Sequence, residues 1–192
     1  NSLIGFDYFE GQLLPDEEER ASVNPFDWKT EFKDVFAKGG FDAVIGNPPY
    51  IDSEWLTKTN PKLRDYCVTR YNSAKGNWDI FCVFVEKSLE LSKGFSSMII
   101  PNKLLSSDYA HATRDYITSK HSILSISDYS SVPVFPVAVY PIVYIVKANT
   151  LNANNMISYE LMKQTDDGKV ITEKTLSVHR ESLNQLNGQS WS

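Results

Sequence analysis

The sequence predicts an α/β layered domain that contains at least two parallel strands. Short apolar runs, typical of buried strands, alternate along the chain with stretches in which apolar residues recur at helical spacing. Glycine and proline stand where one pattern gives way to the next, which marks the ends of the elements. This strand–helix–strand–helix–strand order favours a sheet that has parallel neighbours and helices packed on it.

Length and charge limit the classes of protein that fit. The chain has 192 residues, of which 42% are hydrophobic, and this suffices for a packed core and argues against disorder. The formal net charge is −5, and residues 1–40 account for all of it with nine acids and four bases. A uniformly basic nucleic-acid coat protein is therefore disfavoured, whereas DNA binding through a local basic patch is not.

Cysteine, histidine and hydropathy patterns argue against further classes. Cys67 and Cys82 lie in apolar-periodic stretches, which favours buried, reduced thiols in a cytoplasmic protein. The histidines are scattered without ligand spacing, so no metal site is expected in this chain. The most apolar segment, residues 132–146, is interrupted by prolines, and the first residues do not resemble a signal peptide. We therefore expect no membrane span.

The first 40 residues are predicted to form an acidic lead-in segment. Residues 1–25 are expected to be mostly loop, with a candidate strand at 3–9 and a solvated acidic run at 16–19. Asp27 is expected to cap one short helix, which buries an aromatic face and stops at Gly39-Gly40.

Residues 41–192 are predicted to supply the sheet and its main helices. A cap followed by proline at Asn60-Pro61 favours a helix start, and Gly94 is expected to end the longer helix that begins near Trp78. The last 18 residues are expected to form a weak helix or linker. The other expected elements are strands at 41–45, 95–100, 123–129 and 139–146, a helix around 105–116, and a hairpin over 157–174 turning at 166–168.

The sharpest local feature is Asn47-Pro48-Pro49-Tyr50, at the carboxyl end of the apolar 41–45 run. Ligands bind at this end of the strands in open α/β sheets. Two prolines stiffen the backbone and remove two N–H donors. The Asn47 side-chain oxygen and the Pro48 carbonyl are then two acceptors with little freedom, suited to gripping an exocyclic NH2 group. Tyr50 adds a flat face for stacking on a base.

This arrangement indicates a way to activate an aromatic amine. Such an amine is a weak nucleophile because its lone pair is delocalised into the ring. Two acceptors that bind both amine protons favour a more tetrahedral nitrogen and aim its lone pair at an electrophile. The mechanism needs no strong general base, and the sequence offers no evident histidine or cysteine for one.

The residues 41–50, Phe-Asp-Ala-Val-Ile-Gly-Asn-Pro-Pro-Tyr, resemble motif IV of the amino-group DNA methyltransferases. The preceding residues 24–28, with Phe32 and Gly39-Gly40, resemble the lead-in of type IIG restriction–modification enzymes and their Eco57I-like relatives. Further matches follow in the order of the family motifs over about residues 1–150. They are residues 76–87, residues 94–105, and Val134-Phe135-Pro136 with the strand after it, which resembles motif VIII.

The resemblance implies a partial Rossmann-like S-adenosylmethionine-dependent methyltransferase fold, with a mixed sheet flanked by helices. It implies transfer of a methyl group from S-adenosylmethionine to N6 of an adenine flipped out of double-stranded DNA. Asn47 and Pro48 would hold N6, Tyr50 would stack on the adenine, and Phe135 would pack on its ring from another side. These four are the predicted catalytic residues, and the predicted cofactor contacts are Asn47 and Pro49.

Two family features are missing from the sequence. The glycine-rich cofactor loop that should precede motif IV does not occur in residues 1–46, and only about forty residues follow the last strand, too few for a target-recognition domain. We therefore expect a fragment whose partners are an N-terminal cofactor-binding half and a C-terminal target-recognition domain. Its expected parts are a lead-in at 1–40, the catalytic half at 41–150, and a hairpin with linker at 151–192. Alone it should be inactive, and any endonuclease of the whole protein would lie outside it.

A basic stretch follows the Asn-Pro-Pro-Tyr turn. Residues 57–75 hold five bases and one acid. Phosphates beside a flipped base would lie here, so phosphate contact is one interpretation and ordinary surface solvation is the other. The predicted DNA-binding residues are Lys58, Arg64, Arg70 and Lys75.

Other functions stay open at this point. Asn-Pro-Pro-Tyr also occurs in methyltransferases that act on a glutamine amide of protein release factors or on guanine N2 of RNA. A non-catalytic methyltransferase-like module that binds DNA or a partner is a second alternative. A plain α/β interaction domain, whose Pro-Pro turn only ends a strand, is a third.

Overall fold

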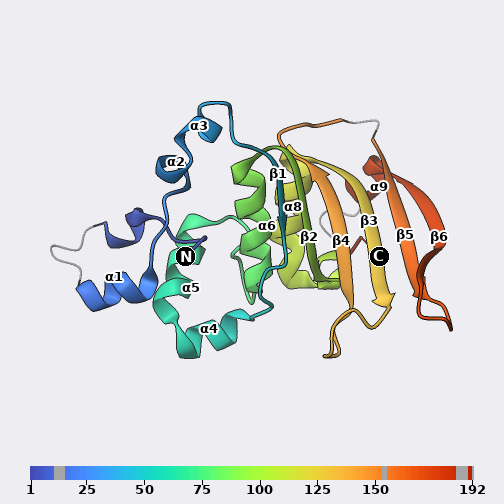
Figure 1. The fold of residues 1–192 in the computed structure, drawn as a ribbon, viewed down its shortest axis with the longest axis horizontal. Coiled ribbons are helices and arrows are strands. Elements are labelled where there is room, and N and C mark those ends of the chain that lie inside the picture. Colours follow the sequence, from blue (N-terminus) through green and yellow to red (C-terminus); the bar gives the residue numbers. More distant parts are fainter. Residues whose placement is uncertain (11–15, 153–154, 185–189, 192) are drawn as a thin grey trace.

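A six-stranded mixed sheet forms the centre of the fold in this computed structural model, which describes residues 1–10, 16–152, 155–184 and 190–191 (Figure 1). The strands lie in the order β1-β2-β4-β3-β5-β6. They are β1 (Phe41–Gly46), β2 (Ser92–Pro101), β3 (Ser122–Ser131), β4 (Pro141–Lys147), β5 (Met156–Gln164) and β6 (Val170–His179).

The strand directions confirm the expected parallel neighbours. β1 runs parallel to β2, and β3 runs parallel to β5. β4 lies between β2 and β3 and is antiparallel to both, while β5 and β6 form the predicted hairpin. The β1–β2 register places Gly46 opposite Met98. The carboxyl end of β1 therefore lies beside the last third of β2, and the Asn47–Tyr50 turn begins there.

Most of the helices lie toward the β1 end of the sheet, and α9 lies near β6 (Figure 1). α6 (Ile80–Leu91) connects β1 to β2 through the intervening helices and packs on β2, and α8 (His111–Lys120) packs on α6 and β3. The other helical elements are η1 (Phe6–Phe9), α1 (Glu17–Val23), α2 (Trp28–Glu31), α3 (Lys33–Phe36), α4 (Ser53–Thr59), α5 (Pro61–Arg70), α7 (Lys103–Ser106), η2 (Asp108–Ala110) and α9 (Arg180–Asn184).

α6 joins two apolar clusters, as the helical spacing of its apolar residues predicts. Burial of each large apolar side chain here contributes about 1.5 to 3 kcal/mol to folding. The sheet-side cluster includes Phe81, Cys82, Val85 and Leu89 of α6 with Ile100 of β2 and Ile142 and Tyr144 of β4. The second cluster includes Ile80 and Val83 of α6 with Leu3, Leu56, Cys67, Tyr71 and Trp78.

The lead-in segment differs from the expectation in its local structure. The candidate strand at 3–9 is wrong, because residues 6–9 form the 3-10 helix η1. The acidic run opens α1 and is not a loop: the Asp16 carboxylate accepts a hydrogen bond from the Glu18 N–H, and acids in a first turn favour a helix N-terminus. The one helix expected after Asp27 is two, α2 and α3, because the backbone at Phe32 leaves the helical region.

Two helix boundaries also differ from the prediction. α6 ends at Leu91, and Gly94 lies inside β2, where a Cβ atom would stand 2.2 Å from the Asp42 carbonyl oxygen. Gly94 thus allows close approach of β1 and does not stop the helix. The sequence analysis missed α4. This helix is capped by Asp52, whose carboxylate accepts a hydrogen bond from the Trp55 N–H at 2.7 Å.

The C-terminal part also divides differently. The helix expected around 105–116 is distributed over α7, η2 and α8. The last 18 residues begin inside β6 and continue into α9, while residues 185–189 and 192 lie outside the described part of the chain.

β1 is an edge strand with exposed apolar side chains, whereas its sequence predicts a buried strand. β1 pairs with β2 on one side, and within the described ranges no strand pairs with its other side. Ile45 of this strand is 82% exposed. An unpaired apolar edge of this kind is a template for another strand.

No helix in the described part of the chain is long and apolar enough to span a membrane. The same residues contain no group of three or more histidine, cysteine or acidic side chains placed to hold a metal ion.

The carboxylate of Glu86, on α6, is fully buried and holds the loop that leads from α5 to α6. It accepts hydrogen bonds from the Asn72 N–H at 3.0 Å, the Asn72 side-chain amide at 2.8 Å and the Ser73 N–H at 2.7 Å. The loop it fixes runs directly into residues 78–80, which bind residues 51 and 53 just after the Asn47–Tyr50 turn.

We expect Glu86→Ala to lower the free energy of unfolding by about 2 to 4 kcal/mol, because it leaves the buried Ser73 N–H and two part-buried Asn72 donors without this partner. Glu54→Ala, at an exposed acid of α4, is the control and should change that free energy by less than about 0.5 kcal/mol. Urea unfolding followed by circular dichroism measures both. Equal effects of the two substitutions would contradict the role given to Glu86.

The exposure of β1 gives a second test. Ile45→Lys should leave the free energy of unfolding within about 0.5 kcal/mol of the parent chain and reduce self-association through the strand edge. Ile100→Ala, on the neighbouring strand and fully buried, should cost about 2 to 5 kcal/mol. Chemical unfolding and sedimentation velocity measure the two effects. A large loss of stability in Ile45→Lys would show that β1 is not an open edge in this chain.

Candidate active site

The Asn47–Tyr50 turn lies at the carboxyl end of β1, between the sheet and α4. Asn47 and Pro49 are exposed, Pro48 is buried, and Tyr50 is half-buried. The Tyr50 hydroxyl donates to the Ile99 carbonyl oxygen of β2 at 3.1 Å and lies 3.4 Å from the Asn47 side-chain oxygen. The tyrosine ring is therefore tied to the neighbouring strand, and its hydroxyl sits beside the predicted amine acceptor.

Phe135 lies beside Tyr50 although 85 positions of the chain separate them. It belongs to the loop between β3 and β4, and its ring is nearly perpendicular to that of Tyr50, with 6.3 Å between centroids and 87° between planes. Apolar residues of the same loop are exposed, including Val137 at 63%. The structure thus brings together Asn47, Tyr50 and Phe135, with Pro48 and Pro49 in the same turn.

Asp79 is a site residue that the sequence analysis missed. Its Oδ1 atom accepts hydrogen bonds from the Ile51 N–H at 3.2 Å and the Phe81 N–H at 3.1 Å. It therefore caps α6 and holds the residue directly after Tyr50. Burial raises the pKa of the Asp79 carboxyl above its usual value, and nearby Asp52 raises that pKa further. Asp79 lies in the stretch 76–87 that resembles a family motif, but that resemblance gave it no role, and its contact with Ile51 is long-range.

The tyrosines near Asp79 stay neutral hydrogen-bond donors. Burial raises the pKa of the Tyr50 hydroxyl, and the Asp79 charge raises it further. Burial, with a contribution from Asp79, raises the pKa of Tyr109 to about 12. Neither hydroxyl is therefore ionised at neutral pH, so neither tyrosine serves as a base there.

A cavity of about 390 Å³ adjoins the turn on its β1 side. Its walls include the Asn47–Pro49 turn, Phe84 of α6, and the exposed apolar edge at Ile45. Its mostly apolar walls suit an aromatic ring such as the adenine of S-adenosylmethionine. Among the described residues no carboxylate lines this cavity, so its residues fit the ring and supply no acidic partner for ribose hydroxyls. Phe84, another residue missed earlier, lines it together with Pro49.

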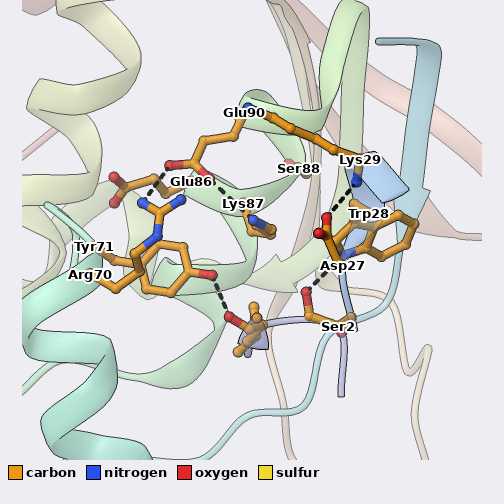
Figure 2. Close-up of polar contacts among 12 residues, drawn as sticks. Ser2, Asp27, Trp28, Lys29, Arg70, Tyr71, Glu86, Lys87, Ser88 and Glu90 are labelled. Carbon is orange, nitrogen blue, oxygen red and sulfur yellow. Dashed lines mark hydrogen bonds and ion pairs between the residues drawn. The ribbon is translucent and has the colours of Figure 1, made fainter. Parts of the chain in front are cut away.

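Polar contacts among the lead-in, α5 and α6 form a second structural centre (Figure 2). The Trp28 indole N–H donates to the Ser2 carbonyl oxygen at 2.9 Å, which ties the lead-in helix α2 to the N-terminus. Glu90 of α6 pairs with Arg70 of α5 at 3.4 Å and with Lys87 at 3.3 Å. The Tyr71 hydroxyl, directly after α5, donates to the Leu3 carbonyl oxygen at 2.7 Å and ties the lead-in to α5, and Trp28 lines the cavity beside the turn.

The predicted phosphate-binding residues differ in their surroundings. Arg70 forms an ion pair with Glu90, and the Arg64 guanidinium lies 3.5 Å from the Asp65 carboxylate. Lys58 and Lys75 are exposed and form no ion pair with other described residues. Lys75 lines a shallow cavity of about 880 Å³ together with residues 106–109 and 111. Phosphate contact at all four positions remains a prediction.

Comparison with known proteins gives a family and a fold. The family model "Eco57I restriction-modification methylase" matches residues 1–135. The type II restriction enzyme and methyltransferase RM.Eco57I of Escherichia coli is 27% identical over 137 residues, 70% of this chain and 13% of that protein. The type II methyltransferase M.BstVI of Geobacillus stearothermophilus is 30% identical over 112 residues, 56% of this chain and 19% of that protein. The chain thus spans less than a fifth of the length of these relatives.

Solved structures share the fold at low sequence identity. The type IIG restriction endonuclease BpuSI matches with a TM-score of 0.55 and 16% identity over 78% of this chain and 20% of that one. A type I restriction–modification methyltransferase subunit from Streptococcus thermophilus matches with a TM-score of 0.55 and 14% identity over 86% of this chain and 39% of that one. These likenesses confirm the predicted fold class, a methyltransferase fold with a mixed sheet flanked by helices.

Proposed function

Because the chain belongs to the Eco57I restriction-modification methylase family, we propose that it is the substrate-facing part of a DNA methyltransferase. The reaction is transfer of a methyl group from S-adenosylmethionine to N6 of adenine in double-stranded DNA, within a restriction–modification protein. One observation carries the proposal: the Asn47–Tyr50 turn and Phe135 converge, with the Tyr50 and Phe135 rings 6.3 Å apart.

The turn supports an amine-gripping mechanism. The Asn47 side-chain oxygen and the Pro48 carbonyl oxygen accept the two protons of the adenine N6 group. With both protons held, the nitrogen lone pair points away from the base, toward an electrophile on the exposed side of the turn. The Tyr50 hydroxyl, 3.4 Å from the Asn47 oxygen, restricts the rotation of the asparagine amide. The chain's contribution is thus orientation of the nucleophile.

The two aromatic rings support recognition of a flipped base. An amine inside a duplex is out of reach, so the adenine leaves the stack and enters the site. Tyr50, tied through its hydroxyl to Ile99, offers a fixed face for stacking. Phe135 stands almost perpendicular to that face and packs against the base from a second side.

The cofactor is shared with a part of the protein outside these residues. The cavity lined by Pro49 and Phe84 accepts the adenine ring of S-adenosylmethionine, and the bound cofactor supplies the methyl group. The exposed β1 edge fits a strand of an N-terminal cofactor-binding half, which would also supply the acidic partners that this cavity lacks. Residues 41–150 then form the catalytic half, residues 1–40 its lead-in, and residues 151–192 a hairpin and linker toward a target-recognition domain.

DNA is the proposed partner, and the cytoplasm is the proposed location. Lys58 precedes α5 in the chain, Lys75 follows it, and both are exposed. Phosphate contacts at these positions and at Arg64 and Arg70 would guide the duplex to the turn. An endonuclease of the whole protein would belong to another part of it. The tetrad alone also fits a glutamine amide or guanine N2, but the family match and the position of Phe135 favour adenine in DNA.

The reaction can be tested with the longest natural chain that contains these residues. Asn47→Ala should lower the rate of labelled methyl transfer to duplex DNA by about 10²-fold or more, because one of the two acceptors for N6 is lost. Asp42→Asn, at the exposed start of β1, is the control and should keep the parent rate. Label found at N6 of adenine supports the proposal. Label found in protein or RNA instead would overturn it.

Cofactor sharing makes a separate prediction for the 192-residue chain itself. Because its cavity holds only the ring end of the cofactor, S-adenosylmethionine should bind with a Kd weaker than about 1 mM. Isothermal titration calorimetry measures this. Micromolar binding would show that the chain contains a complete cofactor site.

A further inference from the structure

The Asn47–Tyr50 turn has few backbone donors of its own to hold it in place, because Pro48 and Pro49 have no N–H group. At its start it is fixed by β1, whose Gly46 pairs with Met98 of β2. At its end the first backbone donor beyond the tyrosine is the Ile51 N–H. Whatever accepts from Ile51 therefore sets where the turn ends.

Residues 51–53 and 78–80 form a short antiparallel bridge at this point. The Ile80 N–H donates to the Ile51 carbonyl oxygen at 2.9 Å, and the Ser53 N–H donates to the Trp78 carbonyl oxygen at 2.9 Å. The Asp79 carboxylate closes the bridge by accepting from the Ile51 N–H at 3.2 Å. Three hydrogen bonds thus connect the end of the turn to the start of α6.

We propose that Asp79 is a positioning residue for the reaction: its carboxylate fixes the Asn47–Tyr50 turn to the first turn of α6 and so sets the geometry of the two amine acceptors. Its Oδ1 atom accepts from Ile51 and Phe81 together. α6 is packed into both apolar clusters, so it is a rigid support. Asp79 thereby transmits the position of a buried helix to an exposed turn.

The groups that face Asp79 fit this role. Asp52 lies across the bridge, and the Asp79 charge raises the pKa of the Tyr50 and Tyr109 hydroxyls. Within the described residues no lysine or arginine pairs with Asp79, and its partners are backbone N–H groups. A carboxylate that binds only backbone N–H groups fixes the two backbone segments relative to each other, which is what a positioning residue requires.

The inference rests on the proposed function only in its kinetic part. In the longest natural chain, Asp79→Ser should keep the helix cap, because serine caps well, but its shorter side chain should no longer reach the Ile51 N–H. We expect kcat for methyl transfer to fall by about 10- to 10²-fold, since a displacement of about 1 Å costs that much. KM for S-adenosylmethionine should change less than kcat, because Asp79 itself does not line the cofactor cavity.

Asp79→Asn is the conservative variant. It keeps an oxygen that can accept from both Ile51 and Phe81, so kcat should stay within about three-fold of the parent. Asp52→Ala is the matched control: Asp52 caps α4 across the same bridge but does not bind the Ile51 N–H. Its kcat should equal that of the parent. A loss of kcat in Asp79→Asn equal to that in Asp79→Ser would show that the charge acts directly, and would overturn the positioning role.

A test that needs no activity uses the 192-residue chain. Hydrogen exchange of the Ile51 amide should speed up by at least about 10-fold in Asp79→Ser and stay unchanged in Asp79→Asn and Asp52→Ala. Unchanged exchange in Asp79→Ser would overturn the proposal whatever the substrate is. If the Ile51 amide of Asp79→Ser exchanges faster but the parent natural chain transfers no methyl group, the hydrogen bond from Ile51 to Asp79 is supported and the proposed function is refuted.

Discussion

Burial of α6 on two sides is the constraint on which the rest of the structure depends. One face of the helix packs on β2 and β4, and the other packs on the cluster formed by α4, α5 and the N-terminus. A helix placed between two cores cannot shift without opening both. Three carboxylates at or in this helix connect it to other segments. Asp79, its cap, binds the residue after the Asn47–Tyr50 turn, Glu86 holds the loop before the helix, and Glu90 pairs with Arg70 of α5. The site is therefore built outward from one buried helix.

Much of this could be predicted from the sequence wherever the determining interactions are local or periodic. The apolar spacing in α6, the cap at Asn60 and the glycine turn of the β5–β6 hairpin each placed an element correctly. The failures come from context. Gly94 could stop a helix or allow close contact of two strands, and only the approach of Asp42 decides. β1 has the composition of a strand paired on both sides, yet its outer edge is exposed in this chain.

The candidate site divides in the same way. The Asn47–Tyr50 turn could be recognised because its chemistry lies in four consecutive residues. Phe135 could be found only through a family resemblance, since a lone phenylalanine in an apolar loop has no signal of its own. Asp79 and Phe84 lie in the stretch 76–87 that resembles a family motif, yet neither was given a role, because their importance arises from contacts with Ile51 and with the cavity beside Pro49, across the fold. Long-range contacts of this kind leave no spacing pattern in a single sequence.

The acidic lead-in acquires a role from its position in the fold. Glu19 of α1 pairs with Lys62, and Glu90 of α6 pairs with Arg70, so two bases of the 57–75 stretch are neutralised from outside it. Both pairs are partly exposed, and each contributes little to stability. Their larger effect is on the field at the surface: positive charge is reduced at Lys62 and Arg70 and retained at Lys58 and Lys75. The acidic lead-in thus neutralises Lys62 and α6 neutralises Arg70, which leaves positive potential at Lys58 and Lys75 in a chain whose net charge is negative.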